Sequence, residues 1–183
     1  MLGRVLVLMV LGFFGLYFFS FSLFADDLYE VSGSPFATEG APIEARIKSL
    51  HEKVIIIDPN EHVYGAYNAE GRLIRWGIAS AGKERCEDTG EHCHTHTGNF
   101  RIYFLGNADC FSRKYNDASM PYCMFFNGGE AIHGSSGVEF QNNSHGCIRV
   151  HISDAEWLRY HFVEGPTVAN QYLGTLVIVR PYF

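Results

Sequence analysis

The residues best suited to do chemistry lie close together in the last third of the chain. His133, His145 and Cys147 stand in a polar, glycine-rich segment from 132 to 150, a composition that favours a loop. A free thiol, with a pKa of about 8.5, is mostly protonated at neutral pH, so a nearby imidazole that takes its proton converts it into a nucleophile. Gly146 allows a tight turn that could aim backbone amides at a developing oxyanion. The alternative is a disulfide-bonded Cys147 beside surface histidines.

A second group of chemically capable residues lies between positions 86 and 96. It contains Cys86 and Cys93 together with three histidines, but their spacing fits neither a Cys-x-x-Cys nor a His-Glu-x-x-His zinc motif. In an oxidising compartment, a disulfide that closes this loop is the simpler interpretation. The chain has five cysteines, an odd number, so one thiol remains when four of them pair.

Two short blocks of the chain carry a family resemblance: Ile132-His133-Gly134 and Ser144-His145-Gly146-Cys147-Ile148-Arg149-Val150. They resemble the active-site signature of the L,D-transpeptidase catalytic-domain family. Upstream, Met120-Pro121-Tyr122 and Phe126-Asn127-Gly128-Gly129 stand where that family has the strand that enters the catalytic histidine. The segment from His96 to Ile102 is similar to its Thr-Pro-Thr-Gly-x-Phe-x-Ile motif, with His96 in place of proline. The resemblance covers roughly Lys53 to Val179.

The resemblance implies a cysteine acyltransferase of the bacterial cell wall that needs no cofactor and no metal. Cys147 would attack the carbonyl before the terminal D-Ala of a peptidoglycan stem tetrapeptide, release D-Ala, and pass the acyl group to an amine acceptor. His133 maps to the general base, oriented by a backbone carbonyl for which Gly134 is the nearest candidate. Water as the acceptor would give an L,D-carboxypeptidase or a related peptidoglycan hydrolase instead. Penem-type β-lactams are expected to acylate Cys147.

Neighbouring residues receive supporting roles from the same resemblance. Ser144, His145, Gly146 and Gly134 are expected to support the loop or the oxyanion. The residues expected to contact substrate are Arg149, Tyr122 and Met120. Arg149 could bind a substrate carboxylate or form an ion pair within the scaffold. Only fourteen positions (147 − 133) separate the two catalytic residues, which predicts a short loop at the substrate entrance.

A catalytic thiol must stay reduced, and this requirement commits the other four cysteines elsewhere. Pairing neighbours in sequence needs the least loop closure, so we predict the disulfides Cys86–Cys93 and Cys110–Cys123.

The elements that must position these residues are mostly strands. Residues 54–57, 62–67, 72–80, 99–105 and 175–180 have the composition of strands, separated by turns such as Asp58-Pro59-Asn60. Ser153 and Glu156 form a capping-box pattern for a helix that runs through His161 and ends before Gly165. The pattern and the resemblance predict a mainly β fold, a β-sandwich or mixed sheet of the L,D-transpeptidase type with a few short helices.

Residues 1–25 have the pattern of a secretion signal or an N-terminal membrane anchor. Arg4 precedes an apolar run that ends at Phe24, and Asp26 begins a polar segment. The run is also long enough to span a bilayer, which keeps an inner-membrane anchor open. Either reading places the remainder in the periplasm or another extracytoplasmic space. Residues 26–52 are predicted to be a linker with a short helix opened by Pro42, and residues 53–183 the catalytic domain.

Composition argues against several other functions. A length of 183 residues fits one ordinary domain, and 47% hydrophobic residues are too many for a disordered chain. The net charge of -6, from 14 basic and 20 acidic residues, is the reverse of what a nucleic-acid binder shows. Two non-enzymatic alternatives stay open: a wall-binding module, which would be expected to lack Cys147 or His133, and a metal-binding module built on the loop at 86–96.

Overall fold

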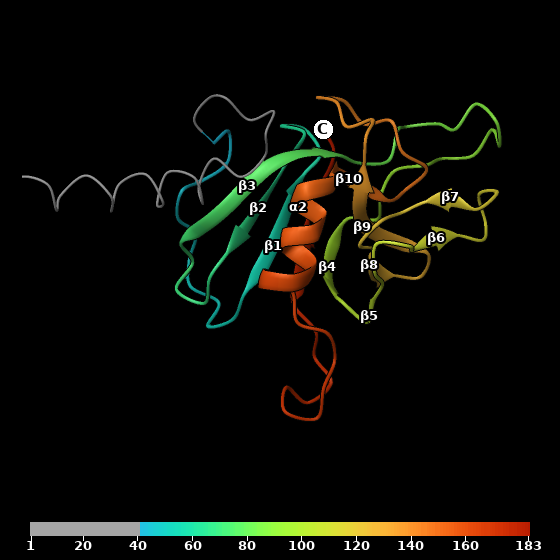
Figure 1. Cartoon of the computed structure of the whole chain (residues 1–183). Helices are drawn as coiled ribbons and strands as arrows, with labels where there is room; N and C mark the ends of the chain where they lie inside the picture. The colour runs from blue at the N-terminus through green and yellow to red at the C-terminus, as the bar shows by residue number, and fades with distance from the viewer. Residues whose placement is uncertain (1–40) are drawn as a thin grey trace, which may run out of the picture.

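The computed structural model describes residues 41–183, which form a curled sheet with one short α-helix packed against it (Figure 1). The predicted signal or anchor at 1–25 and the first part of the predicted linker lie outside the described residues. In the part of the chain that is described, no helix is long and apolar enough to cross a membrane.

The main sheet has nine strands and is mixed. The pairs β1–β11 and β9–β10 are parallel, and the other neighbours are antiparallel. Only Ile102 and Tyr103 separate β4 from β5, although these strands lie at opposite ends of the sheet order, so the sheet must curl. The predicted mainly β fold with a mixed sheet is confirmed. In spatial order the strands are β4 (Gly98–Arg101), β11 (Leu176–Val179), β1 (Val54–Asp58), β2 (Val63–Tyr67), β3 (Leu73–Ser80), β10 (Ile148–His151), β9 (Glu130–Ser135), β8 (Met124–Asn127) and β5 (Phe104–Leu105).

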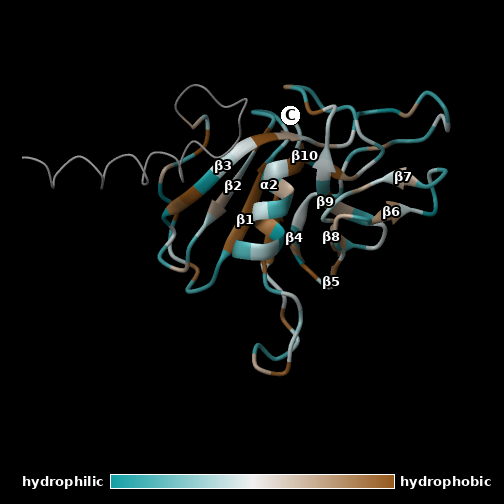
Figure 2. Ribbon diagram, viewed as in Figure 1, coloured by the Kyte–Doolittle hydropathy of each residue, from teal (hydrophilic) through white to brown (hydrophobic). Residues whose placement is uncertain are grey.

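The core follows from the two-residue period of the central strands. In β1, Ile55 and Ile57 face the cluster that also takes in the helix residue Leu158, while Val54 and Ile56 face a second cluster around Trp76. Burying one such isoleucine contributes about 1.5–3 kcal/mol. Figure 2 shows hydrophobic residues along these strands and hydrophilic residues in the surrounding loops. β1 is therefore buried on both faces, between β11 and β2.

A separate two-stranded hairpin stands beside the main sheet (Figure 1). It consists of β6 (Phe111–Ser112) and β7 (Ala118–Ser119), and the Cys110–Cys123 disulfide closes the segment that contains it. The other disulfide joins Cys86 to Cys93, and Cys147 is the free cysteine. The predicted pairing is confirmed.

The short helix predicted after Pro42 is wrong. Residues 41–52 contain no helix and run extended beside the β2–β3 turn. The Ile47 amide donates to the Gly71 carbonyl at 2.8 Å, and the Leu73 amide donates to the Ala45 carbonyl at 3.0 Å. These bonds to a distant turn replace the helical ones, and Ile43 and Ile47 pack in the cluster around Trp76.

The late helix exists but begins differently from the prediction. Helix α2 (Ile152–Trp157) follows β10 directly, and the ring of His151 accepts the Ser153 amide at its start. Glu156 does not cap the helix; its carboxylate accepts the Tyr122 hydroxyl at 2.9 Å. A π-helical segment, η1 (Leu158–Phe162), continues α2. The predicted strand at 99–105 is also divided, into β4 and β5.

Candidate active site

Cys147 directly precedes β10, at the end of a loop that Ser144 holds in place. The buried Ser144 hydroxyl accepts the Gly146 amide at 3.1 Å and donates to the Cys147 carbonyl oxygen. The Ser144 backbone bonds to Ala81 and Lys83, beside the end of β3. Gly146 has a φ of +111°, a conformation that favours glycine. Gly146 therefore makes the turn, and its amide is already engaged by Ser144 rather than left for an oxyanion.

His133 lies on β9 rather than in the loop expected from its polar surroundings. The parallel β9–β10 register places it beside Arg149. Because side chains alternate along a strand, His133, Ser135 and Arg149 share one face of the sheet with Cys147, while Ile132, Ile148 and Val150 enter the core. The segment 132–150 is thus two strands joined by a loop.

A cavity of about 660 Å³ lies on this face of β9 and β10. Cys147, His133 and Arg149 line it from the sheet, and Lys114 and Tyr115 line it from the β6–β7 hairpin. The nucleophile and the proposed base therefore face the same space, with the hairpin as its opposite wall. The other lining residues are Asp88, Ser112, Asn116, Ala118, Ser119, Met120, Ser135, Ser144 and His145.

The surroundings of His133 favour the neutral imidazole with its proton on Nδ1. Burial lowers the pKa of His133 to about 4; the Gly134 hydrogen bond opposes this effect and the Arg149 guanidinium adds to it. Nδ1 lies 2.9 Å from the Gly134 carbonyl oxygen, which can only accept. The Nδ1 proton therefore points to Gly134, and Nε2 keeps a lone pair able to receive a proton. This backbone carbonyl is the orienting partner that the resemblance suggested.

The Cys147 thiol is held in its protonated form. Burial raises its pKa, as does the charge of Glu130, while the Ala131 amide and the cations Arg149 and Lys114 act in the opposite direction. The thiol donates to the Gly129 carbonyl at 3.8 Å. The resting pair is thus a neutral thiol and a neutral imidazole.

Of the three predicted substrate contacts, Arg149 and Met120 line the cavity and Tyr122 does not. Arg149 donates to the Asn143 side chain at 3.1 Å, and in residues 41–183 no carboxylate forms an ion pair with it. Tyr122 does not line the cavity; it donates to Glu156 and packs edge-on against Tyr160. Tyr122 therefore contributes to the scaffold through Glu156 and Tyr160, and its substrate contact stays a prediction.

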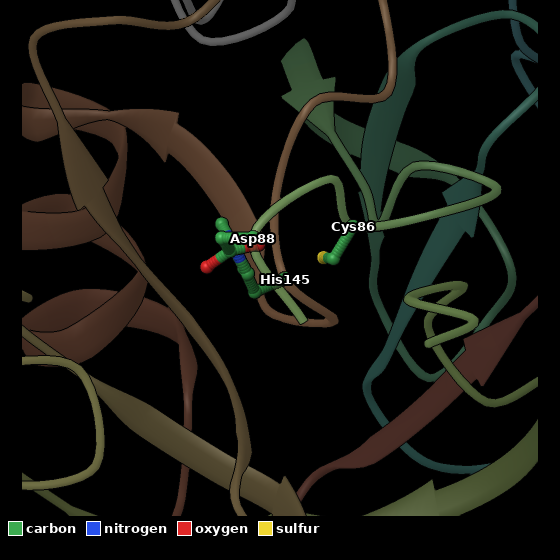
Figure 3. A group of neighbouring side chains, drawn as sticks. All are labelled: Cys86, Asp88 and His145. Atoms are coloured by element: carbon green, nitrogen blue, oxygen red, sulfur yellow. The ribbon is translucent and has the colours of Figure 1, made fainter. Parts of the chain in front are cut away.

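His145 connects the loop of Cys147 to the loop closed by Cys86–Cys93. Its Nε2 lies 3.0 Å from both carboxylate oxygens of Asp88, and this hydrogen bond is the main cause that lowers the pKa of Asp88. Figure 3 shows these two side chains together with Cys86 beside them. Although the three residues could converge on a metal, the Cys86 sulfur is committed to the disulfide and is no thiolate ligand. The hydrogen bond between His145 and Asp88 therefore joins the loop of Cys147 to the loop closed by Cys86–Cys93.

Several residues near the thiol were missed by the sequence prediction. Lys114 and Tyr115 come from the hairpin, and the only available signal was their position between the paired Cys110 and Cys123. Glu130 is three residues before His133. The only feature of the sequence that could have pointed to it is its position at the start of a strand.

The curled mixed sheet, with a free thiol and a buried imidazole lining one cavity, corresponds to a known domain family. The family model of the L,D-transpeptidase catalytic domain matches residues 52–179. The chain belongs to this family. No curated protein sequence is significantly similar to it.

Solved structures of L,D-transpeptidases have the same fold. One from Xylanimonas cellulosilytica has a TM-score of 0.62 at 28% identity, over 75% of this chain and 65% of that chain. One from Stackebrandtia nassauensis has a TM-score of 0.57 at 20% identity, over 74% of this chain and 58% of that chain. One from Mycobacterium tuberculosis has a TM-score of 0.55 at 18% identity, over 70% and 57%. The match thus spans under two thirds of each of these structures.

Proposed function

We propose that this chain is a cell-wall L,D-transpeptidase in which Cys147 carries the acyl group and His133 moves the proton. The observation that carries the proposal is the shared cavity. A free thiol and an imidazole oriented by the Gly134 carbonyl both line it. Family membership supports the reaction class. The substrate would be the stem tetrapeptide of peptidoglycan, and the product an acyl group transferred to an amine.

The reaction begins from the neutral pair. Nε2 of His133 takes the Cys147 proton as the sulfur attacks the carbonyl before the terminal D-Ala, and the resulting imidazolium protonates the leaving amine. The Nδ1 hydrogen bond to Gly134 stabilises that imidazolium as it forms. Arg149 and Lys114 give the cavity two cations, which suits the carboxylates of a stem peptide. The acyl group is then held on sulfur as a thioester until an acceptor attacks it.

Solved relatives support the expectation that penem-type β-lactams react here. One L,D-transpeptidase from Mycobacterium tuberculosis was solved with a faropenem-derived adduct, at 17% identity and a TM-score of 0.52 to this chain. The strained β-lactam carbonyl would acylate Cys147 through the same proton transfer.

We place this activity in the periplasm or another extracytoplasmic space. Two disulfides that pair four of the five cysteines support an oxidising compartment. The predicted signal or anchor at 1–25 supports the same location.

Incubation with a purified tetrapeptide muropeptide, followed by mass spectrometry of the products, tests the proposal. The wild-type chain is expected to release D-Ala and form a cross-linked product, and Cys147→Ala to do neither. D-Ala release without cross-linked product would identify the L,D-carboxypeptidase alternative. D-Ala release by Cys147→Ala would refute the mechanism.

A further inference from the structure

A second cavity, of about 480 Å³, reaches Cys147 from another direction. The loop at 89–96 and the β8–β9 turn form most of its wall, whereas His133 and Arg149 are absent from it. Cys147 thus lines two cavities, and most of the other residues that line them differ. The lining residues are Thr89, Glu91, His92, Cys93, His94, His96, Lys114, Tyr115, Asn127, Gly128, Gly129, Glu130, His145, Gly146 and Cys147.

Strand β9 explains the division between the cavities. Glu130 and His133 are three residues apart on this strand, so their side chains point to opposite faces. His133 faces the first cavity and Glu130 the second. A Cβ built on Gly146 would lie 3.4 Å from Oε1 of Glu130, which places this carboxylate against the turn that carries Cys147.

The Glu130 carboxylate is held by hydrogen bonds but has one hydrogen-bond acceptor position unfilled. Oε1 accepts the His96 backbone amide at 3.0 Å and lies 3.0 Å from His96 Nδ1, and Oε2 accepts the Asn127 side-chain amide at 2.8 Å. Two carboxylate oxygens together offer about four acceptor positions. One position therefore remains on Oε2, on a side chain that lines the cavity and is 13% exposed. That position fits one N–H of a cation.

We propose that Glu130, positioned by His96 and Asn127, binds the ammonium group of the acceptor in the second cavity and takes its first proton. This role rests on the proposed transferase function and specifies its acceptor as a primary amine rather than water. Of the other charged groups of this cavity, Glu91 lines only the second cavity and favours a cation, whereas Lys114 lines both cavities and opposes one.

In the second half-reaction the acceptor nitrogen must lose two protons, and Glu130 is placed to take the first of them. The acceptor arrives as an ammonium ion and gives one proton to Glu130. Its nitrogen then attacks the thioester carbon, the C–N bond forms, and the C–S bond breaks. The second proton leaves the nitrogen for His133, which is neutral again after protonating D-Ala, and passes to the departing sulfur. Glu130 releases its proton to water, which balances the proton taken up by the D-Ala amine.

The test compares Glu130→Gln with wild type, using a charged and an uncharged acceptor. Each protein is given tetrapeptide with either a primary alkylamine, which is an ammonium ion at neutral pH, or hydroxylamine, which is uncharged. Glu130→Gln is expected to lower kcat/KM for the alkylamine at least tenfold, mainly through KM. Transfer to hydroxylamine and acylation by a penem should not become slower, because loss of the Glu130 charge lowers the pKa of the Cys147 thiol. Glu70→Gln, which removes a charge from an exposed turn, is the matched control and should match wild type for both acceptors.

The outcomes separate this proposal from the function on which it rests. An equal effect of Glu130→Gln on both acceptors, or no effect on either, would overturn the acceptor role while leaving the Cys147–His133 chemistry in place. D-Ala release with hydrolysis as the only fate of the wild-type acyl-enzyme would also overturn it. Failure of the wild-type chain to release D-Ala at all would refute the proposed function itself.

Discussion

Acidification from pH 7 to pH 4 is expected to destabilise the fold through His133. Burial, supported by the Arg149 guanidinium, lowers the pKa of this imidazole from 6.5 to about 4 in the folded protein, while the unfolded chain restores its ordinary value. Below pH 6.5 the unfolded state therefore binds a proton that the folded state does not, so stability falls as the pH falls. The loss continues until the folded imidazole itself takes a proton near pH 4.

The size of this effect follows from the two pKa values. The interval from 6.5 to about 4, at about 1.36 kcal/mol per pH unit, corresponds to a loss of about 3 kcal/mol. Urea unfolding of wild type and His133→Asn at pH 7 and at pH 4 would measure it, with the disulfides intact. Asparagine retains a donor for the Gly134 carbonyl but cannot take up a proton. The stability difference between the two proteins should shift by about 3 kcal/mol in favour of His133→Asn on acidification.

Other groups also change protonation between pH 7 and pH 4. The effect of His133 is therefore taken from the difference in stability between the variants. His161→Asn, at an exposed position of η1, controls for the loss of an imidazole as such. If wild type and His133→Asn lost stability equally between pH 7 and pH 4, His133 would not be held as a desolvated neutral base.

Two further predictions concern the supports of the site. Ser144→Ala removes the buried hydroxyl that joins Gly146 to Cys147, and we expect a loss of about 1–3 kcal/mol in urea unfolding and at least tenfold slower penem acylation. Unchanged acylation would show that the loop does not depend on this hydroxyl. The double variant Cys110→Ser/Cys123→Ser opens a loop of 13 residues, and loop-closure entropy gives an expected loss of about 3 kcal/mol. Stability equal to that of wild type would show that the bridge contributes nothing to holding the hairpin.

The sequence points to His133 and Cys147 as the candidate pair because both stand in local patterns, and both residues line one cavity. His133 and Cys147 are recognisable from their immediate neighbours, and the cysteine pairing follows from short loop closure and the need for one free thiol. The central strands can be predicted equally well from the sequence, because Val54 to Ile57 form an apolar run between turns. Short-range patterns therefore suffice where the structure is determined by short-range interactions.

The remaining features depend on contacts between distant segments. Pro42 suggests the start of a helix, yet hydrogen bonds to the β2–β3 turn decide the conformation there. Tyr122 stands in a motif associated with the site, but its hydroxyl is drawn to Glu156 on α2. Lys114 and Glu130 reach Cys147 through a hairpin and a strand edge, and no local pattern marks either of them.

The central claim is that the Cys147 sulfur carries the acyl group, and intact-protein mass spectrometry tests it most directly. The protein is mixed with tetrapeptide and quenched in acid within the first turnover, and one portion is measured intact and another after digestion. The mass is expected to rise by one tripeptide acyl group, equal to the donor minus D-Ala, with the adduct mapped to the peptide that contains Cys147. An adduct on any other residue, or D-Ala release with no adduct on Cys147 at any quench time, would contradict the account.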